Sequence, residues 1–268
     1  ALTATPIPRS LAMVAYGDLD CSVIDELPPG RTPVTTTLID HDRRDAVIKR
    51  VGAACRDGRQ AYWVCTAIEE SDSLHMEAAT ATLETLSAAL PGVAIGLVHG
   101  KLKPADKASV MAQFKAGTLQ LLVATTVIEV GVDVPKASLM IIDNAERLGL
   151  AQLHQLRGRV GRGAIESHCV LLFRPPLSIT AQERLKVMQD THDGFVIAEA
   201  DLRIRGPGEL LGTRQTGLAQ FRVARLPEHE ALLIRAHDIA QQLHQHDVAR
   251  AQALMTRWAG PRADFARV

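Results

Sequence analysis

Short apolar runs alternate along this chain with segments in which apolar residues recur every three or four positions. The runs consist mostly of Val, Ile, Leu and Ala, which predicts buried strands. The segments between them end at Gly or Pro, which is typical of helices. Strands are expected at 34–39, 61–66, 93–99, 121–125, 137–143 and 169–173, and helices at 42–57, 73–90, 104–115 and 150–154.

This alternation of strand and helix determines the expected fold class, α/β. Short connections between successive elements require a parallel sheet with helices on both faces. Ligands of such sheets bind at the carboxyl ends of the strands. After the last strand the pattern is helical only: helices at 184–193 and 195–204 joined at Gly194, a polar loop, and a helical tail at 227–258.

The most informative segment is residues 155–162, with the sequence QLRGRVGR. Arginine presents a planar fork of donors that matches phosphate oxygens, and glycine allows close approach of a ligand. A bare pair of arginines would fit a solvated basic helix end better than a phosphate site. The Gln and the two glycines at fixed offsets favour a phosphate-binding segment instead.

Residues 155–162 resemble motif VI of the superfamily 2 helicases, Q-x-x-G-R-x-G-R. Residues 124–135 (ATTVIEVGVDVP) resemble motif V, residues 2–9 resemble motif III, and all three follow the order of that superfamily. The resemblance implies a RecA-like lobe with helices on both faces of a parallel sheet. It further implies catalytic roles for Gln155, Arg159 and Arg162, nucleotide binding by Glu129, Gly131, Asp133 and Gly158, and DNA contacts by Thr125 and Thr126.

The segment after the last strand narrows the family. Its two helices and the loop at 206–217 (GPGELLGTRQTG) resemble the TRG motif that RecG and Mfd translocases share, and residues 16–31 have the RecG-like form. The resemblance implies that Arg205, Arg214 and Gln215 couple ATP turnover to motion on double-stranded DNA. Arg203 stands where the family pattern has an acidic residue. The basic side chain removes a possible ion pair between this position and Arg205.

Neither a P-loop nor a Walker B segment is found. The stretch 96–101 has the wrong spacing, and Leu102 stands where a P-loop hydroxyl should be. The carboxylates of 22–26 come after motif III, whereas a Walker B segment precedes it, and Asp143 with Glu146 is a similar decoy. We therefore expect ATP and Mg²⁺ to be bound mainly by a missing first lobe, no metal to be held by this chain, and the chain alone to be inactive.

The chain starts inside the segment that resembles motif III, so we expect it to be the C-terminal part of a longer protein. Four segments are predicted: the end of the first lobe and the inter-lobe connection at 1–30, the second RecA-like lobe at 31–175, the TRG hairpin and loop at 176–225, and a helical tail at 226–268.

Composition restricts the remaining choices. The chain has 268 residues, of which 47% are hydrophobic and 3% aromatic, and its 30 basic and 30 acidic side chains cancel. DNA contacts must therefore come from local patches. The four cysteines form no C-x-x-C pair and are read as reduced core thiols, and the lone histidines 99, 154 and 168 as structural residues. No membrane span or signal peptide is found, and reduced thiols are typical of a cytosolic protein. We expect a cytoplasmic protein, and we expect it to be a monomer.

The function expected from the resemblance is that of a branch-migrating helicase. The chain would be the C-terminal half of an ATP-dependent translocase that acts on double-stranded DNA at forks and Holliday junctions in recombination and repair. The alternatives are an Mfd-like transcription-repair translocase and a RecA-like lobe used only for binding. Arg159 and Arg162 argue against the last, because a docking lobe needs neither.

Overall fold

The computed structural model of the chain describes five segments: residues 33–66, 72–126, 134–163, 165–205 and 230–259. These residues belong to two compact units, one ending before the loop at 206–229 and one containing the helices after it. Each unit is described by itself. The segments that resemble motif III and the RecG-like stretch at 16–31 lie outside the described residues, as do the centre of motif V and the loop at 206–217.

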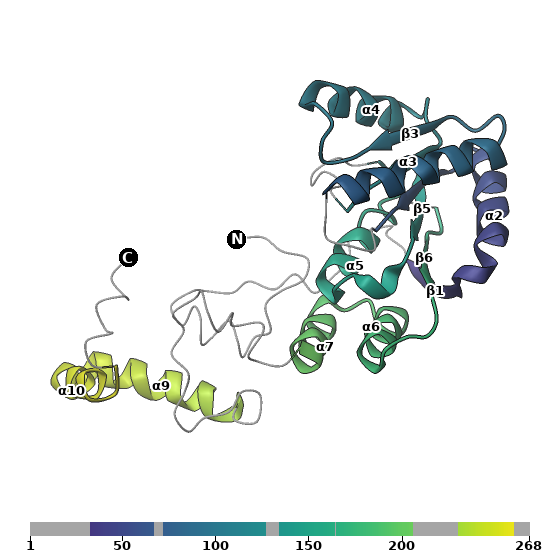
Figure 1. The fold of residues 1–268 in the computed structure, drawn as a ribbon. Helices are drawn as coiled ribbons and strands as arrows, with labels where there is room; N and C mark the ends of the chain where they lie inside the picture. The colour runs from purple at the N-terminus through teal and green to yellow at the C-terminus, as the bar shows by residue number, and fades with distance from the viewer. Residues whose placement is uncertain (1–32, 67–71, 127–133, 164, 206–229, 260–268) are drawn as a thin grey trace. The chain divides into compact units, whose positions relative to one another are not determined.

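The first unit is built on a sheet of six parallel strands (Figure 1). All six predicted strands are confirmed, each to within two residues at either end. Their order in the sheet is β1-β6-β5-β2-β4-β3. The strands are β1 (Thr35–Asp40), β2 (Gln60–Val64), β3 (Ile95–Val98), β4 (Leu121–Ala124), β5 (Ala137–Ile142) and β6 (His168–Phe173).

Helices cover both faces of this sheet, which confirms the predicted RecA-like arrangement. Successive strand residues point to opposite faces, so Trp63 packs in one core cluster and Tyr62 in the other. Helices α2 and α3 pack on the first face, and α4 to α7 on the second. The helices are α2 (Arg44–Arg56), α3 (Asp72–Ala89), α4 (Pro104–Ala116), α5 (Leu150–Arg157), α6 (Ile179–Asp190) and α7 (Gly194–Arg205).

Local hydrogen bonds explain where helix ends differ from the prediction. Residues 41–43 form a 3-10 turn (His41–Arg43) whose Asp42 amide donates to Asp40 Oδ1 at 2.9 Å, so α2 begins at residue 44 and not at 42. Helix α6 begins five residues earlier than predicted, because Ser178 Oγ accepts from the Ala181 amide at 3.2 Å as an N-cap. Gly194 is the first residue of α7 rather than a joint between helices.

Helices α6 and α7 pack into the same core as the sheet. Leu185 and Met188 of α6, with Ile197 and Ala200 of α7, are buried in the cluster that also contains the apolar face of α5. The expected TRG hairpin is therefore held firmly against the lobe that precedes it. The helical tail is confirmed as two helices, α9 (Glu230–His246) and α10 (Val248–Ala259), and the Asp247 carboxylate caps the second by accepting from the Arg250 amide.

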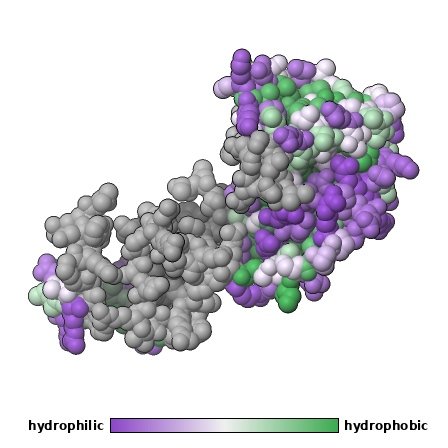
Figure 2. Space-filling view, viewed as in Figure 1, coloured by the Kyte–Doolittle hydropathy of each residue, from purple (hydrophilic) through white to green (hydrophobic). Residues whose placement is uncertain are grey.

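Three of the four cysteines lie in the described part of the chain and are buried free thiols. Burial raises the pKa of Cys55 to about 11 and the pKa of Cys65 and of Cys169 to about 12, so all three stay protonated. Lys49 and Arg50 of α2 are exposed, and the side of the first unit on which α2 lies is largely hydrophilic (Figure 2). Within the described segments, no helix combines the length and the apolarity that crossing a bilayer requires.

Candidate functional site

The segment that resembles motif VI begins on α5 and continues into the turn after it. Leu150, Leu153 and Leu156 recur at helical spacing and are buried, which fixes the face that α5 turns to the core. Gln155 is exposed on the last turn of that helix. The helix is three residues longer than predicted, so Gln155 and Arg157 are both helical.

The turn after α5 presents two arginines. Val160 is fully buried and holds the turn against the core, and Gly161 adopts a left-handed conformation with φ +75°. Arg159 is half-buried, whereas Arg162 is exposed and donates from Nε to the carbonyl of Gly158 at 3.2 Å. The local sequence thus fixes both arginine backbones on one short turn.

The electrostatics of this turn suit an anion. Burial lowers the pKa of Arg159, and the neighbouring positive charge of Arg162 lowers it further, while Tyr62 acts in the opposite direction. The described residues contribute no carboxylate to this shift. Among the described residues, the Arg159 guanidinium has no hydrogen-bond acceptor. The two guanidinium groups repel each other, and a bound phosphate would relieve that repulsion.

The end of motif V lies against the end of motif VI. A Cβ atom on Gly163 would lie 2.6 Å from the carbonyl oxygen of Pro135, so the two backbones approach closely only because residue 163 is Gly. At the start of motif V, the Thr125 amide donates to Val98 O at 3.2 Å and its side chain is buried, whereas Thr126 is partly exposed. Glu129, Gly131 and Asp133 lie outside the described residues.

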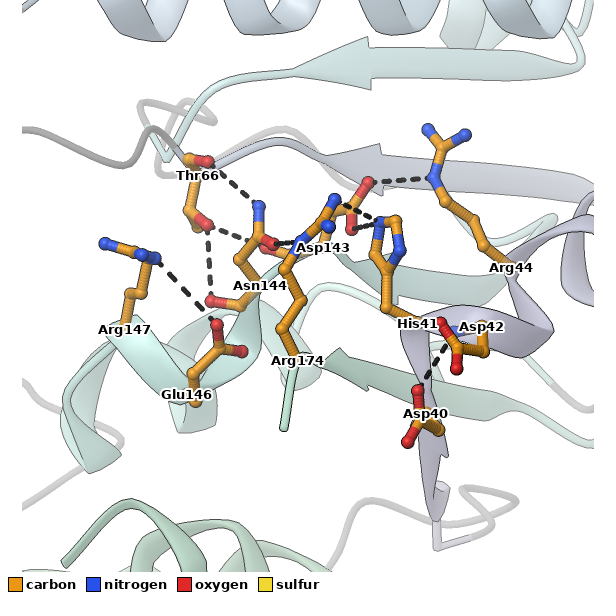
Figure 3. Close-up of polar contacts among 10 residues, drawn as sticks. All are labelled: Asp40, His41, Asp42, Arg44, Thr66, Asp143, Asn144, Glu146, Arg147 and Arg174. Carbon is orange, nitrogen blue, oxygen red and sulfur yellow. Dashed lines mark hydrogen bonds and ion pairs between the residues drawn. The ribbon is translucent and has the colours of Figure 1, made fainter. Parts of the chain in front are cut away.

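A polar network lies at the carboxyl ends of the strands (Figure 3). Thr66, after β2, donates from Oγ1 to Asp143 O at 2.7 Å, and Asn144 Nδ2 donates back to Thr66 O at 3.3 Å. Asn144 adopts a left-handed backbone (φ 50°), and its Oδ1 accepts from Arg174 Nε, after β6, at 2.9 Å. Side chains that follow three separate strands are thereby joined at the rim where ligands of such sheets bind.

The carboxylate of Asp143 completes this network. Arg44, at the start of α2, donates from Nε to Asp143 Oδ2 at 3.2 Å (Figure 3). His41 Nε2 lies 2.7 Å from the guanidinium of Arg174, which can only donate, so the imidazole is the acceptor there. The Asp143 carboxylate, through Arg44, thus connects the start of α2 with the carboxyl end of β5. Sequence reasoning examined it only as a decoy for a Walker B carboxylate, because its arginine partner is 99 residues away in the chain.

Side chains of α6 and α7 tie the helical pair to itself and to the lobe. Arg184 donates to the carbonyls of Leu148 and Glu146, at 2.9 and 3.0 Å. Arg203, which departs from the family pattern, pairs instead with Glu183 on the facing helix at 2.6 Å. The Arg205 side chain, Arg214 and Gln215 lie outside the described residues, and within the described part no cluster of metal-ligating side chains is present.

Two known families match this chain. Residues 42–164 match the helicase conserved C-terminal domain, and residues 191–256 match domain 3, C-terminal, of the ATP-dependent DNA helicase RecG. The matched ranges contain most of the lobe and the helices that follow α6.

Individual relatives and one solved structure agree with these matches. The chain is 66% identical over 258 residues to RecG of Escherichia coli strain K12, covering 96% of this chain and 37% of that protein. It is 46% identical to RecG of Bacillus subtilis strain 168, covering 92% and 36%. A structure of RecG bound to a three-way DNA junction matches with a TM-score of 0.68 and 47% identity, covering 86% of this chain and 30% of that one.

The chain spans little more than a third of the length of the curated relatives it matches. Within that span, the residues that resemble motifs V and VI, the parallel sheet and the helical pair all agree with one assignment. The chain belongs to the RecG family of ATP-dependent DNA helicases.

Proposed function

We propose that this chain is the C-terminal part of an ATP-driven translocase that moves on double-stranded DNA and branch-migrates forks and Holliday junctions. The observation that carries the proposal is the paired arginines of motif VI on a chain of the RecG family. A relative bound to a three-way DNA junction supports branched DNA as the substrate. The proposed enzyme acts in the cytoplasm, as a monomer, in recombination and repair.

In this proposal, motif VI acts on an ATP molecule that is bound mainly by a first lobe. A P-loop and a Walker B segment supply the phosphate cradle and the Mg²⁺ site in such enzymes, and a first lobe would supply both. Arg159 and Arg162 would contact the terminal phosphate, and Gln155 would act with them in catalysis. Gly158, which has no Cβ, would allow the nucleotide to approach the backbone closely. Hydrolysis of bound ATP supplies the free energy for movement. Glu129, Gly131 and Asp133 of motif V remain proposed nucleotide contacts.

We assign the DNA-facing role among the two threonines to Thr126. Thr125 is only 3% exposed, so its side chain is suited to packing rather than to contact with a phosphate backbone. Thr126 is partly exposed at the carboxyl edge of the sheet. The proposed segments are those expected from the sequence: the end of a first lobe at 1–30, the second lobe at 31–175, the TRG hairpin and loop at 176–225, and a helical tail at 226–268.

The proposal separates ATP hydrolysis from DNA movement, and that separation can be tested at the loop. Gln215→Ala and Arg205→Ala in the full-length protein should retain most DNA-stimulated ATP hydrolysis and lose branch migration, because a coupling contact must form in one lobe arrangement and break in another. Gln241→Ala, an exposed glutamine of α9 bonded to His237, is the matched control and should affect neither activity.

Hydrolysis would be measured by phosphate release and migration on a fluorescent three-way junction. Parallel loss of both activities would mean that the loop only supports the fold. Failure of the unaltered full-length protein to remodel any branched DNA with ATP would refute the proposed function itself.

A further inference from the structure

Arg174 is an exposed arginine that directly follows β6 and has no part in the proposed ATP chemistry. Its Nε donates to Asn144 Oδ1 at 2.9 Å, and its Nη2 lies 2.7 Å from His41 Nε2. Figure 3 shows the guanidinium between these two side chains. A free arginine side chain samples many rotamers, and fixing it costs conformational entropy. The guanidinium of Arg174 is already fixed at two points, so a ligand would meet it pre-organised.

The two acceptors that hold Arg174 are fixed in turn by the sheet. They follow β5 and β1, the two strands that flank β6. Asn144 adopts a left-handed backbone, and its Nδ2 donates to Thr66 O at 3.3 Å, which orients the amide with its oxygen toward Arg174. His41 belongs to the 3-10 turn that begins directly after β1. The guanidinium is therefore held from both sides of its own strand.

The positive charge of Arg174 is not neutralised by these contacts, because an amide and an accepting imidazole are both neutral. The Asp143 carboxylate of the same network is hydrogen-bonded to Arg44, and Asp40 Oδ1 accepts from the Asp42 amide. Among the described residues, no carboxylate lies within ion-pair distance of Arg174, and its Nη1 has no hydrogen-bond acceptor. An exposed, fixed guanidinium with unused donors matches the charge and the geometry of a phosphate.

The position of Arg174 in the sheet distinguishes DNA phosphate from nucleotide phosphate. Arg174 lies at the carboxyl ends of the strands, whereas the motif VI turn lies toward the opposite ends, since Gly163 approaches Pro135, which precedes β5. Thr126, to which we assign a DNA-facing role, follows β4 at the same edge as Arg174. Strands β4 and β6 are three spacings apart in the sheet, or about 14 Å. That separation is close to the width of the DNA major groove, about 12 Å.

From this geometry we propose that Arg174 binds a phosphate of the DNA backbone, and that Asn144 and His41 are positioning residues that hold its guanidinium for this contact. The inference rests on the proposed function, in which duplex DNA is the substrate. A phosphate contact from a fixed side chain sets the register of a protein on the duplex without reading its sequence. Arg174 would therefore help to place any duplex arm of a junction along this edge of the sheet.

The test measures the affinity of the full-length protein for a fluorescent three-way junction as a function of salt concentration. Each phosphate contact adds about 0.9 to the slope of log affinity against log salt. Arg174→Gln should bind more weakly, and the ratio of its Kd to that of the unaltered protein should fall about 3.5-fold between about 50 and about 200 mM salt. Arg174→Lys keeps the charge and should keep the slope. Arg56→Gln removes an exposed arginine from the other end of α2, toward the amino ends of the strands, and should leave the slope unchanged.

Unfolded protein lowers the active concentration but leaves the salt slope of the folded fraction unchanged, so instability cannot imitate the result. An unchanged slope in Arg174→Gln would overturn the proposal. A raised KM for ATP together with an unchanged slope would also overturn it, by assigning the arginine to the nucleotide. Failure of the unaltered full-length protein to bind the junction would instead refute the proposed function.

The positioning part is tested by Asn144→Gly, which removes the acceptor and tolerates the left-handed backbone. This substitution should weaken junction binding in the unaltered protein and have no further effect in Arg174→Gln, because it acts only through the arginine. Equal losses of affinity in the two backgrounds would show that Asn144 does not act through Arg174 and would overturn its assigned role.

Discussion

At the residue scale, Gly163 shows how little space separates motifs V and VI. A methyl group there would meet the Pro135 carbonyl at 2.6 Å, and a backbone carbonyl cannot swing away as a flexible side chain can. Gly163→Ala should therefore destabilise the first unit by about 1–3 kcal/mol, as overpacking does elsewhere. It should also lower DNA-stimulated ATP hydrolysis, because the turn that carries Arg162 shifts.

Gly158→Ala is the matched control for the fold. Its Cβ would lie 3.4 Å from His154 O, and its φ of −66° is open to any residue, so stability should not change. A fall in ATP hydrolysis of this variant alone would support close approach of phosphate to Gly158. Unfolding would be followed by the fluorescence of buried Trp63 in a Trp258→Phe background. Unchanged stability in Gly163→Ala would contradict the close contact.

His154 makes stability depend on pH. Its pKa is lowered to about 4 by burial, then by Arg157 and His192, against the opposing charge of Asp193. In the unfolded chain the His154 imidazole binds a proton with a pKa near 6.5, whereas in the folded state it stays neutral at that pH. His154 therefore does not change the free energy of unfolding above pH 6.5, and it lowers that free energy as the pH falls from 6.5 towards 4.

His154→Gln should flatten the pH dependence of the unfolding free energy between pH 4 and 6.5, by on the order of 1–2 kcal/mol after allowance for the ring's partial exposure to water. Urea titrations at several pH values, read at Trp63, would measure it. An equal slope in both proteins would show that the imidazole titrates normally.

Sequence predicts side chains whose chemistry is local and misses those whose partners are remote. Arg159 and Arg162 could be proposed as phosphate-binding residues because glycines and a glutamine stand at fixed offsets from them. The role of Asp143 could not, since Arg44 reaches it only after the strand order of the sheet is known. The same holds for Arg157, whose carbonyl acceptors lie 31 and 34 residues later.

At the element scale, apolar periodicity predicted all six strands because buried parallel strands must be apolar on both faces. It placed helix ends less well, since those depend on single capping bonds such as that of Ser178. Periodicity also could not show that α6 and α7 would share the core of the lobe. Their apolar faces are visible in the sequence, but the surface that receives them is formed by α5.

The contact between the start of α2 and the end of β5 can be tested through its contribution to stability. Arg44 is the hydrogen-bonded partner of the Asp143 carboxylate, and its guanidinium lies 5.0 Å from the ring centroid of Trp63. Arg44→Met keeps the aliphatic stem and leaves a buried carboxylate without its arginine, so it should cost about 3 kcal/mol or more. The unfolding free energy would be measured at Trp63.

The neighbouring Arg43 is exposed on the 3-10 turn and provides the control. Arg43→Met should change stability by less than about 0.5 kcal/mol, as surface substitutions usually do. Equal effects of the two substitutions would show that the Arg44–Asp143 pair contributes nothing beyond a surface charge.

At the scale of the whole molecule, the chain combines a RecA-like lobe with a helical pair fixed to it and a separate helical unit. The sequence contains no P-loop, so in the proposed function the arginines of motif VI act on a nucleotide that other residues hold. Inactivity of this chain alone stays a prediction. The central claim is that motif VI completes an ATP site across a cleft.

The most direct measurement of that claim is the DNA-stimulated turnover number of ATP hydrolysis for Arg162→Ala in the full-length protein. An arginine that stabilises the transition state contributes about 10³-fold or more, so turnover should collapse while affinity for a three-way junction and the unfolding midpoint stay near those of the unaltered protein. Arg162→Lys should rescue poorly, because a point charge does not reproduce bidentate geometry. Turnover of Arg162→Ala close to that of the unaltered protein would contradict the account and return this arginine to DNA contact or to structure.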